Sequence, residues 1–330
     1  MMKNIRRIGL VGAFVLAGML AVQAAAARAL VVGTGASTLA DAKAAGTEAA
    51  GLAKAALGGE SPKLVAVFAA RKQLTPELVS GVAEVFEKAL ISGCEGYAPL
   101  TAAGNFADQG HEIKNGVTVL ALGGQADVKL VADVVRKEDG KDGFTACGQR
   151  IGDQLKAAVT AASGSKLIFT FGNQHVGSNQ PYVEGLLKAL GSNVPVVGAA
   201  AGGGNAKEIV KGELVTGANV AVLICGGFKL GLGLSGGNGD LVAKADESLS
   251  KAVKAQPGKP ALLLVFDCGG RRGELFKQKK LADEFVRMRA IAPETPLFGF
   301  YGGGEIGTAA LAEPAKGVGF SVASAALFAE

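Results

Sequence analysis

The sequence is poor in the residues on which several kinds of protein depend. It has no Trp, two His and four Cys in 330 residues, and aromatic residues make up 5% of the chain. Four cysteines in this length do not make a disulfide framework, and two histidines leave little material for a His-rich metal site. We therefore predict no metal and no cofactor. Charged residues make up only 19% against 49% hydrophobic residues, which excludes an intrinsically disordered chain.

Glycine, in contrast, is abundant, with 50 residues. The glycines follow no three-residue period, so a collagen-like chain is excluded. The stretch from Gly231 to Gly236 has the spacing G-x-G-x-x-G of dinucleotide-binding loops. Its glycines alternate within a strand-like run, without the strand, turn and helix that such a loop requires, so it is weak support for a nucleotide site.

The first 29 residues have the pattern of an export signal. A basic start is followed by about 15 apolar residues and then by small residues. Cleavage sites of the A-x-A type end at Ala24 and Ala29. The apolar stretch is short for a membrane span, which favours a cleaved signal peptide over 1–29 against the alternative of an uncleaved anchor. The sequence thus predicts an exported, periplasmic or extracellular protein with no membrane span after cleavage.

Removing this segment also changes the charge. The formal net charge of the whole chain is +5, and residues 1–29 contain four basic residues, which leaves 30 basic against 29 acidic residues. The remainder has no stripe of Lys and Arg interleaved with aromatic residues. A nucleic-acid partner is therefore not predicted.

The rest of the chain contains a threefold internal repeat. Each copy begins with a helical pattern, which is followed by an apolar run. A second helical pattern and a second apolar run, which ends in glycine, come next. The run-ending glycines Gly93, Gly198 and Gly299 are spaced by 105 and 101 residues, and a third apolar run closes each copy. The sequence thus predicts the α/β class, with three related helix–strand–helix–strand–strand units. The helices are expected over 41–57, 75–90, 149–162, 179–190, 246–255 and 276–291, and the strands over 63–68, 90–93, 117–124, 166–171, 194–198, 220–227, 262–266, 296–299 and 318–328.

The first strand of each unit is apolar at every position, which is typical of a strand buried on both faces. Two such strands joined by a helix predict a right-handed parallel crossover, and the third strand is expected to add antiparallel. The second helix of the first unit has the clearest start. Thr75 suits the N-cap, Pro76 the first helical position and Glu77 the positive end of the helix.

Polar residues gather where the predicted parallel strands end. Ligands of open parallel sheets bind beyond the carboxyl ends of the strands, so these loops are expected to share one edge. Guanidinium groups there suit a carboxylate or phosphate, and glycines let backbone N–H groups approach a ligand. The same loops also carry Arg71, Lys72 and Tyr97. The candidate ligand-binding residues are Cys94, Glu95, His175, Cys268, Arg271, Arg272, Tyr301, Gly304 and Glu305.

Each candidate also has a purely structural interpretation. Glycines after strands are typical of tight turns. Arg271 and Arg272 would equally well solvate a rim or pair with Glu305. Cysteine and tyrosine suit packing, and an isolated histidine in a polar loop usually binds nothing.

The residues of the last unit carry a family resemblance. The string from Phe266 to Gly273, a helix, and the string from Pro296 to Gly307 resemble the C-terminal half of FIST domain proteins. The stretches 33–38 and 91–96 fit the N-terminal half. The resemblance implies a layered, two-part α/β structure, with a FIST N-terminal-like region over 30–230 and a C-terminal-like region over 231–330. It also implies a sensory module that binds a small, amino-acid-like ligand, with Cys268, Arg271 or Arg272, Tyr301 and Glu305 as the family-like residues.

The function expected from these observations is small-ligand binding outside the cytoplasm, not catalysis. The ligand is expected to be anionic or zwitterionic, with Arg271 and Arg272 holding a carboxylate and Glu305 accepting an ammonium group. A separate signalling partner protein is expected to read out binding. The alternatives are an enzyme with Cys268 or Cys94 as nucleophile, a haem-binding protein and a purely structural protein.

Overall fold

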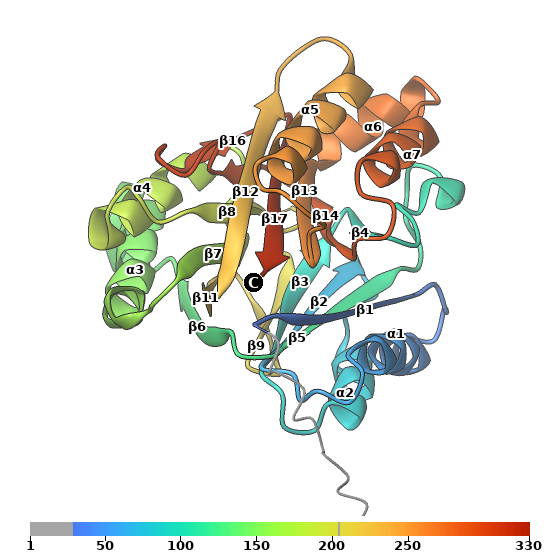
Figure 1. The fold of residues 1–330 in the computed structure, drawn as a ribbon, viewed down its shortest axis with the longest axis horizontal. Helices are drawn as coiled ribbons and strands as arrows, with labels where there is room; N and C mark the ends of the chain where they lie inside the picture. Colours follow the sequence, from blue (N-terminus) through green and yellow to red (C-terminus); the bar gives the residue numbers. More distant parts are fainter. Residues whose placement is uncertain (1–28, 204) are drawn as a thin grey trace, which may run out of the picture.

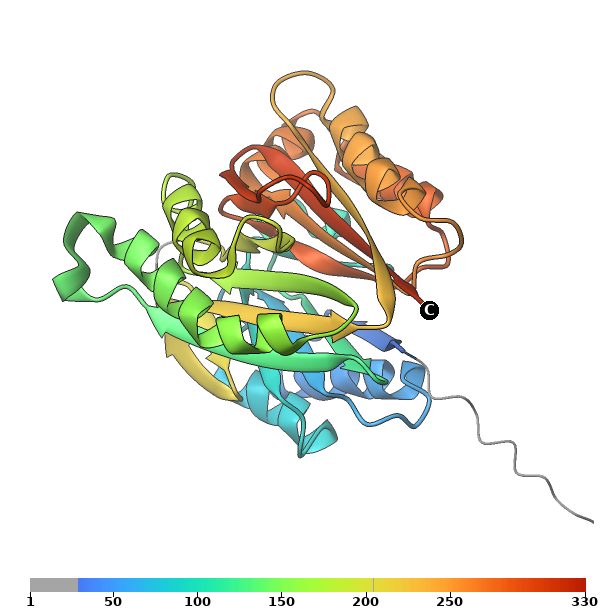
Figure 2. The same ribbon diagram turned by 60° about the vertical axis from the view of Figure 1, so that its left-hand side comes forward.

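Three mixed β-sheets with helices on their outer sides make up the fold (Figures 1 and 2). The computed structural model describes residues 29–203 and 205–330. The predicted signal peptide therefore lies, but for Ala29, outside the described residues. Within the described ranges, no helix is long and apolar enough to cross a membrane.

Each unit builds the same four-stranded arrangement, in the spatial order first, fourth, second, third strand. The first unit consists of β1 (Val31–Ser37), α1 (Ala42–Ala56), β2 (Leu64–Ala70), α2 (Pro76–Val85), β3 (Ile91–Gly96) and β5 (Val117–Gly123). The second consists of β6 (Asp127–Val134), α3 (Gly143–Ala161), β7 (Ser165–Gly172), α4 (Asn179–Leu190), β8 (Val196–Ala200) and β11 (Ala218–Gly226). The third consists of β12 (Phe228–Gly236), α5 (Leu241–Lys254), β13 (Leu262–Cys268), α6 (Gly269–Lys277), α7 (Leu281–Ile291), β14 (Leu297–Gly302) and β17 (Ser321–Ala329).

The predicted strand pairing is confirmed in all three units. The pairs β2–β3, β7–β8 and β13–β14 are parallel, and the closing strands β5, β11 and β17 pair antiparallel with β2, β7 and β13. The start of α2 is also as predicted. The side chain of Thr75 accepts a hydrogen bond from the backbone N–H of Leu78, and Pro76 is the first helical residue.

The structure differs from the prediction in that each unit begins with a strand. Strands β1 and β12 were missed because they contain several glycines, which weaken a strand signal. Strand β6 has no glycine, but charged residues interrupt its apolar positions. The glycines let a helix lie close to the sheet: a Cβ on Gly33 would stand 2.1 Å from the carbonyl oxygen of Ala53 in α1, and one on Gly231 would stand 1.8 Å from that of Ala252 in α5. The G-x-G-x-x-G spacing therefore belongs to the packing of β12 against α5.

A second difference concerns the helix expected over 276–291. The structure has two helices here, α6 and α7, which meet at a bend. Lys279 in the bend has a left-handed backbone, with φ of 58°. A continuous helix cannot pass through that conformation.

Short strands are exchanged between the units in a cycle. Strands β9 (Lys207–Val210) and β10 (Glu213–Thr216) of the second unit extend the sheet of the first beyond β3. Strands β15 (Glu305–Gly307) and β16 (Lys316–Val318) of the third unit extend the sheet of the second beyond β8. Strand β4 (Ala98–Thr101) of the first unit pairs with β14 of the third. Each sheet is thus completed by another unit, which gives the chain a pseudo-threefold organisation.

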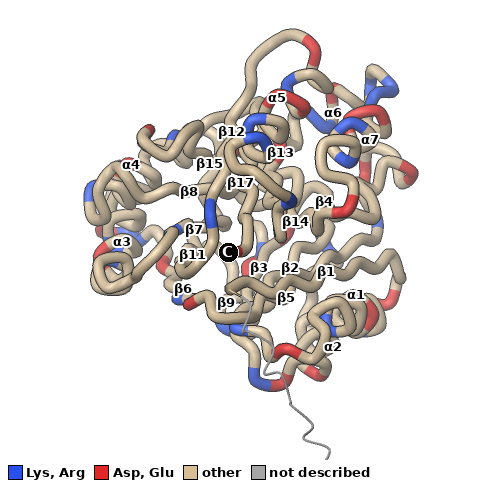
Figure 3. The backbone as a smooth tube through the Cα atoms, in the orientation of Figure 1, with Lys and Arg blue, Asp and Glu red and all other residues tan. Residues whose placement is uncertain are grey.

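The inner faces of the three sheets meet in an aromatic core. Phe68 of β2 lies at its centre, with ring centroids of Phe300 at 4.4 Å, Phe298 at 4.7 Å and Phe171 at 5.6 Å. The outer faces pack against the helices, and charged residues lie mainly outside the sheets (Figure 3). Strand β2 is accordingly buried along its whole length, as its apolar sequence predicts.

Candidate functional site

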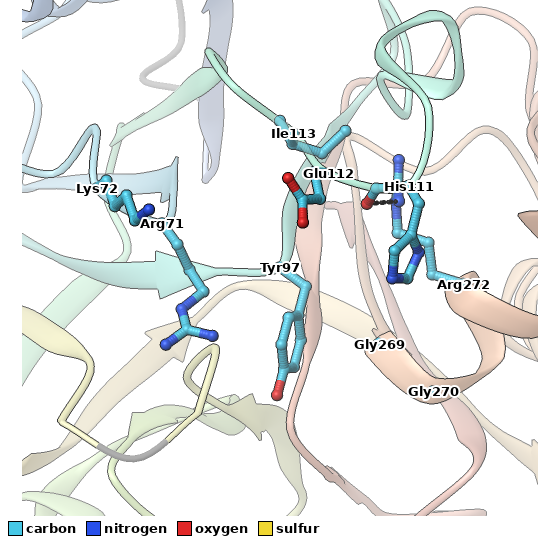
Figure 4. A pocket seen from close by; sticks show the side chains of 9 residues that line it. All are labelled: Arg71, Lys72, Tyr97, His111, Glu112, Ile113, Gly269, Gly270 and Arg272. Atoms are coloured by element: carbon cyan, nitrogen blue, oxygen red, sulfur yellow. Dashed lines mark hydrogen bonds between the residues drawn. The ribbon is translucent and has the colours of Figure 1, made fainter.

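A pocket of about 590 Å³ lies where β2 and β3 end beside the start of α6 (Figure 4). It therefore joins the first and third units at the carboxyl ends of parallel strands, the edge on which the sequence predicts a site. The long connection between β4 and β5, which includes a short 3₁₀ turn (Ala107–Gln109), closes one side. The lining residues are Arg71, Lys72, Tyr97, His111, Glu112, Ile113, Gly269, Gly270 and Arg272.

Two exposed cations form one side of this pocket. Arg71 and Lys72 directly follow β2, and neither forms an ion pair with a residue that the structure describes. Lys72 has a left-handed backbone, with φ of 72°, a costly conformation for a residue with a side chain. Glu95 holds this turn, since its carboxylate accepts the backbone N–H groups of Lys72 and Lys207, each at 3.2 Å.

The start of α6 forms the opposite side. A helix start carries partial positive charge and N–H groups without helical partners. No side-chain hydrogen bond caps this helix, whose N-cap residue is Cys268. Tyr97 stands between the two sides in Figure 4. Its ring packs against Gly269, where a Cβ would stand 2.3 Å from a ring carbon, and the guanidinium carbon of Arg71 is 5.9 Å from the ring centroid.

Arg272 anchors the wall that closes the pocket. Its side chain is buried and donates hydrogen bonds to the backbone oxygens of His111 and Gly110, each at 2.9 Å, and of Phe106 at 3.4 Å. Its guanidinium carbon also lies 5.7 Å from the ring centroid of Tyr301. Arg272 therefore fixes the segment that carries His111 while lining the pocket itself.

Arg271, its neighbour, lies in a separate buried network. Its Nε donates to Asp267 at 2.7 Å, and its Nη2 donates to Glu284 at 2.8 Å and to the carbonyl of Leu241 at 2.9 Å. The hydroxyl of Tyr301 donates to the other oxygen of Glu284 at 2.9 Å. The structure thus places Arg271 and Tyr301 beneath α6, and neither lines the pocket.

Cys268 and Glu305 are buried neighbours at the end of β13. Burial, with Glu305 adding to it, raises the pKa of the Cys268 thiol to about 11. Burial likewise raises the pKa of Glu305, whose carboxylate accepts the backbone N–H of Ser321 at 3.0 Å. Gly304, with φ of 148°, lies beside Val176.

The remaining candidates lie apart from the pocket. Cys94 is fully buried in β3, where burial and the charges of Glu208 and Glu95 raise its pKa. His175 is exposed and packs its ring against Gly303, where a Cβ would stand 2.4 Å from a ring carbon. Of the nine candidates, Arg272 alone lines the pocket.

Sequence reasoning missed two buried glutamates, Glu208 and Glu284, and one wall of the pocket. Glu208 of β9 pairs with Cys94 in register, as Glu305 of β15 pairs with Ala199. The carboxylate of Glu208 accepts the backbone N–H of Ala218 at 3.1 Å, and burial raises the pKa of Glu208 to about 8. The recurring Glu-Ile pair at 208–209 and 305–306 was the available signal. The wall of His111–Ile113 had none, because the exchanged strand β4 brings it there.

The fold and the pocket define the protein as a three-unit α/β protein with a ligand-sized pocket at the ends of its strands. Residues 63–239 match the FIST N domain and residues 234–308 match the FIST C domain. The chain belongs to the FIST domain family, as its sequence motifs indicate. FIST domains are generally sensory and bind small ligands.

Comparison with curated proteins finds no match. Among solved structures, a cyanuric acid hydrolase from A. caulinodans is 12% identical, with a TM-score of 0.45 over 90% of this chain and 99% of that one. A second cyanuric acid hydrolase is 10% identical, with a TM-score of 0.47 over the same shares. Phosphoribosylformylglycinamidine synthase II from Thermotoga maritima is 8% identical, with a TM-score of 0.29 over 92% of this chain and 72% of that one. Such distant likeness says nothing about what this chain binds.

Proposed function

We propose that the protein is an extracytoplasmic FIST protein that binds a small anionic or zwitterionic ligand in the pocket between β2, β3 and α6. The observation that carries the proposal is the pair of exposed cations, Arg71 and Lys72, facing the start of α6 across one pocket. Both sides attract negative charge. The export pattern of residues 1–29 supports the location, and a separate protein would read out binding.

The roles of the two sequence-predicted arginines shift in this proposal. Arg271 already holds two carboxylates of its own chain, and Arg272 holds three backbone carbonyls. Both support the site from beneath, while Arg71 supplies the guanidinium fork for the ligand. Glu112, which also lines the pocket, replaces Glu305 as the group that would accept an ammonium.

The buried thiols support binding rather than catalysis by a cysteine nucleophile. A reactive cysteine needs a lowered pKa and access to its substrate. Burial instead raises the pKa of both Cys268 and Cys94, so both are protonated at neutral pH. We therefore propose no enzymatic activity for these residues.

The experiment is a thermal-shift screen of the protein with amino acids and small carboxylates, repeated with Arg71→Ala and Lys72→Ala. A ligand that raises Tm in the native protein should lose most of its effect in both variants. Arg287→Ala is the matched control, since Arg287 is an exposed arginine of α7, away from the pocket. Shifts that survive both substitutions would show that the ligand binds elsewhere.

A further inference from the structure

The charges of the pocket point to a more specific ligand. We infer that the site takes a small organic dianion, with one anionic group at Arg71 and Lys72 and the other at the start of α6. This inference rests on the proposed function, since it concerns the same pocket. The inference is narrower than the proposed function, which allows any small anion or zwitterion. We expect a zwitterion, or an anion with one charged end, to bind more weakly than a dianion.

The first argument is the separation of the two positive sides. Arg71 and Lys72 lie on one side of Tyr97, and Gly269, Gly270 and Arg272 lie on the other (Figure 4). The Tyr97 ring packs between Arg71 and Gly269, so a single carboxylate cannot occupy both positions. A pocket of about 590 Å³ has room for a ligand that spans them.

The second argument is the balance of charge. The lining side chains include three permanent cations, Arg71, Lys72 and Arg272, and one carboxylate, Glu112. With histidine counted as neutral, the net charge of these lining side chains is +2. A dianion cancels that excess, whereas a zwitterion leaves it unchanged.

The third argument is an unused hydrogen-bond donor on the α6 side. Arg272 is only 2% exposed, and its Nε has no partner among the residues that the structure describes. A buried donor without a partner is costly. Since Nε is itself buried, a ligand oxygen would reach it after a small shift of the guanidinium group, and that contact would relieve the cost. Gly270, which also lines the pocket, has no side chain, so an anionic group can approach the backbone of α6 there.

Three four-carbon probes test the inference, because they differ only at one end. Succinate is a dianion, γ-aminobutyrate a zwitterion and butyrate a monoanion. In calorimetric titrations of the protein at low ionic strength, succinate should bind at least tenfold more tightly than either of the others. Arg71→Ala should reduce succinate to the affinity of butyrate, and Glu112→Gln should tighten succinate. Arg287→Ala should leave all three affinities unchanged.

A fourth probe, 3-phosphoglycerate, distinguishes the anionic groups. Tighter binding of this probe than of succinate would assign a phosphate to one end of the ligand, and weaker binding would assign two carboxylates. Either result supports a two-ended anion. Equal affinities for succinate, γ-aminobutyrate and butyrate, all lowered alike by Arg71→Ala, would overturn the dianion and leave the proposed function standing. If no anion or zwitterion binds, both fail.

Discussion

Two pairs of consecutive basic residues follow equivalent strands, and they have opposite surroundings. Arg71 and Lys72, after β2, are exposed and form no ion pair with a described residue, whereas Arg271 and Arg272, after β13, are buried and hydrogen-bonded to protein groups. Basic side chains that follow corresponding strands are thus exposed at the pocket in one unit and buried within the structure in another. The two pairs differ in burial and in their hydrogen-bond partners, and not in the sign of their charge.

The sharpest test of this difference is Arg271→Met. It leaves Asp267 and Glu284 buried without their cation, and breaking a buried ion pair in this way typically costs about 3–5 kcal/mol. Urea unfolding should show a loss of this size. Arg71→Met, on the exposed pair, should change stability by less than about 0.5 kcal/mol. Equal losses from the two substitutions would erase the distinction between the pairs.

Arg272→Ala should have the next largest effect. It removes three hydrogen bonds to the segment from Phe106 to His111 and leaves those carbonyls without their donor, which costs about 1–3 kcal/mol. Amide hydrogen exchange should accelerate in that segment before it does in the sheets. A uniform acceleration over the whole chain would mean that Arg272 supports the fold as a whole and not this wall of the pocket.

Two of the exchanged strands carry a buried glutamate, Glu208 in β9 and Glu305 in β15. Burial raises the pKa of Glu208 from 4.5 to about 8, so between these values the folded protein holds a proton that the unfolded chain has released. Stability should therefore fall as pH rises through this interval, by about 1.4 kcal/mol per pH unit for this group. Glu208→Gln should flatten the slope in urea unfolding between pH 5.5 and 7.5. An unchanged slope would exclude Glu208 as its source.

Lys72→Asn should give a small change in stability, and a gain. Asn tolerates the left-handed backbone at this position better than Lys, so stability should rise by less than about 1 kcal/mol. Succinate affinity should fall at the same time, since a charge is lost from the pocket. This opposition would show that the strained turn is retained for binding. A gain in stability with unchanged affinity would remove Lys72 from the site.

The sequence predicts the parallel pairs and the edge of the site well, because these depend on local apolar runs and on their order. It does not predict the first strand of each unit, because glycines in β1 and β12 and charged residues in β6 weaken the side-chain pattern. Nor does it distinguish Arg271 from Arg71. The difference between them comes from Glu284, which reaches Arg271 only because α7 folds back onto α6, and such a contact has no trace in local sequence.

The exchanged strands explain why the sequence does not predict β4 or the wall of the pocket at His111–Ile113. Strand β4 has four residues, and its partner β14 comes from the far end of the chain. So short a run, paired over such a distance, gives no periodicity to detect. The wall of His111–Ile113 follows this strand into the pocket, so it could not be placed without the fold.

The cyclic exchange also has a consequence for how the chain folds. The sheet of the first unit needs β9 from the second, and the sheet of the third needs β4 from the first. No unit can therefore protect its own sheet edge, and a fragment that ends between units would expose unpaired strands that favour aggregation. The pairing also joins residues far apart in sequence, which slows folding. The three repeats are thus expected to fold and unfold together, as one cooperative structure rather than as three separable modules.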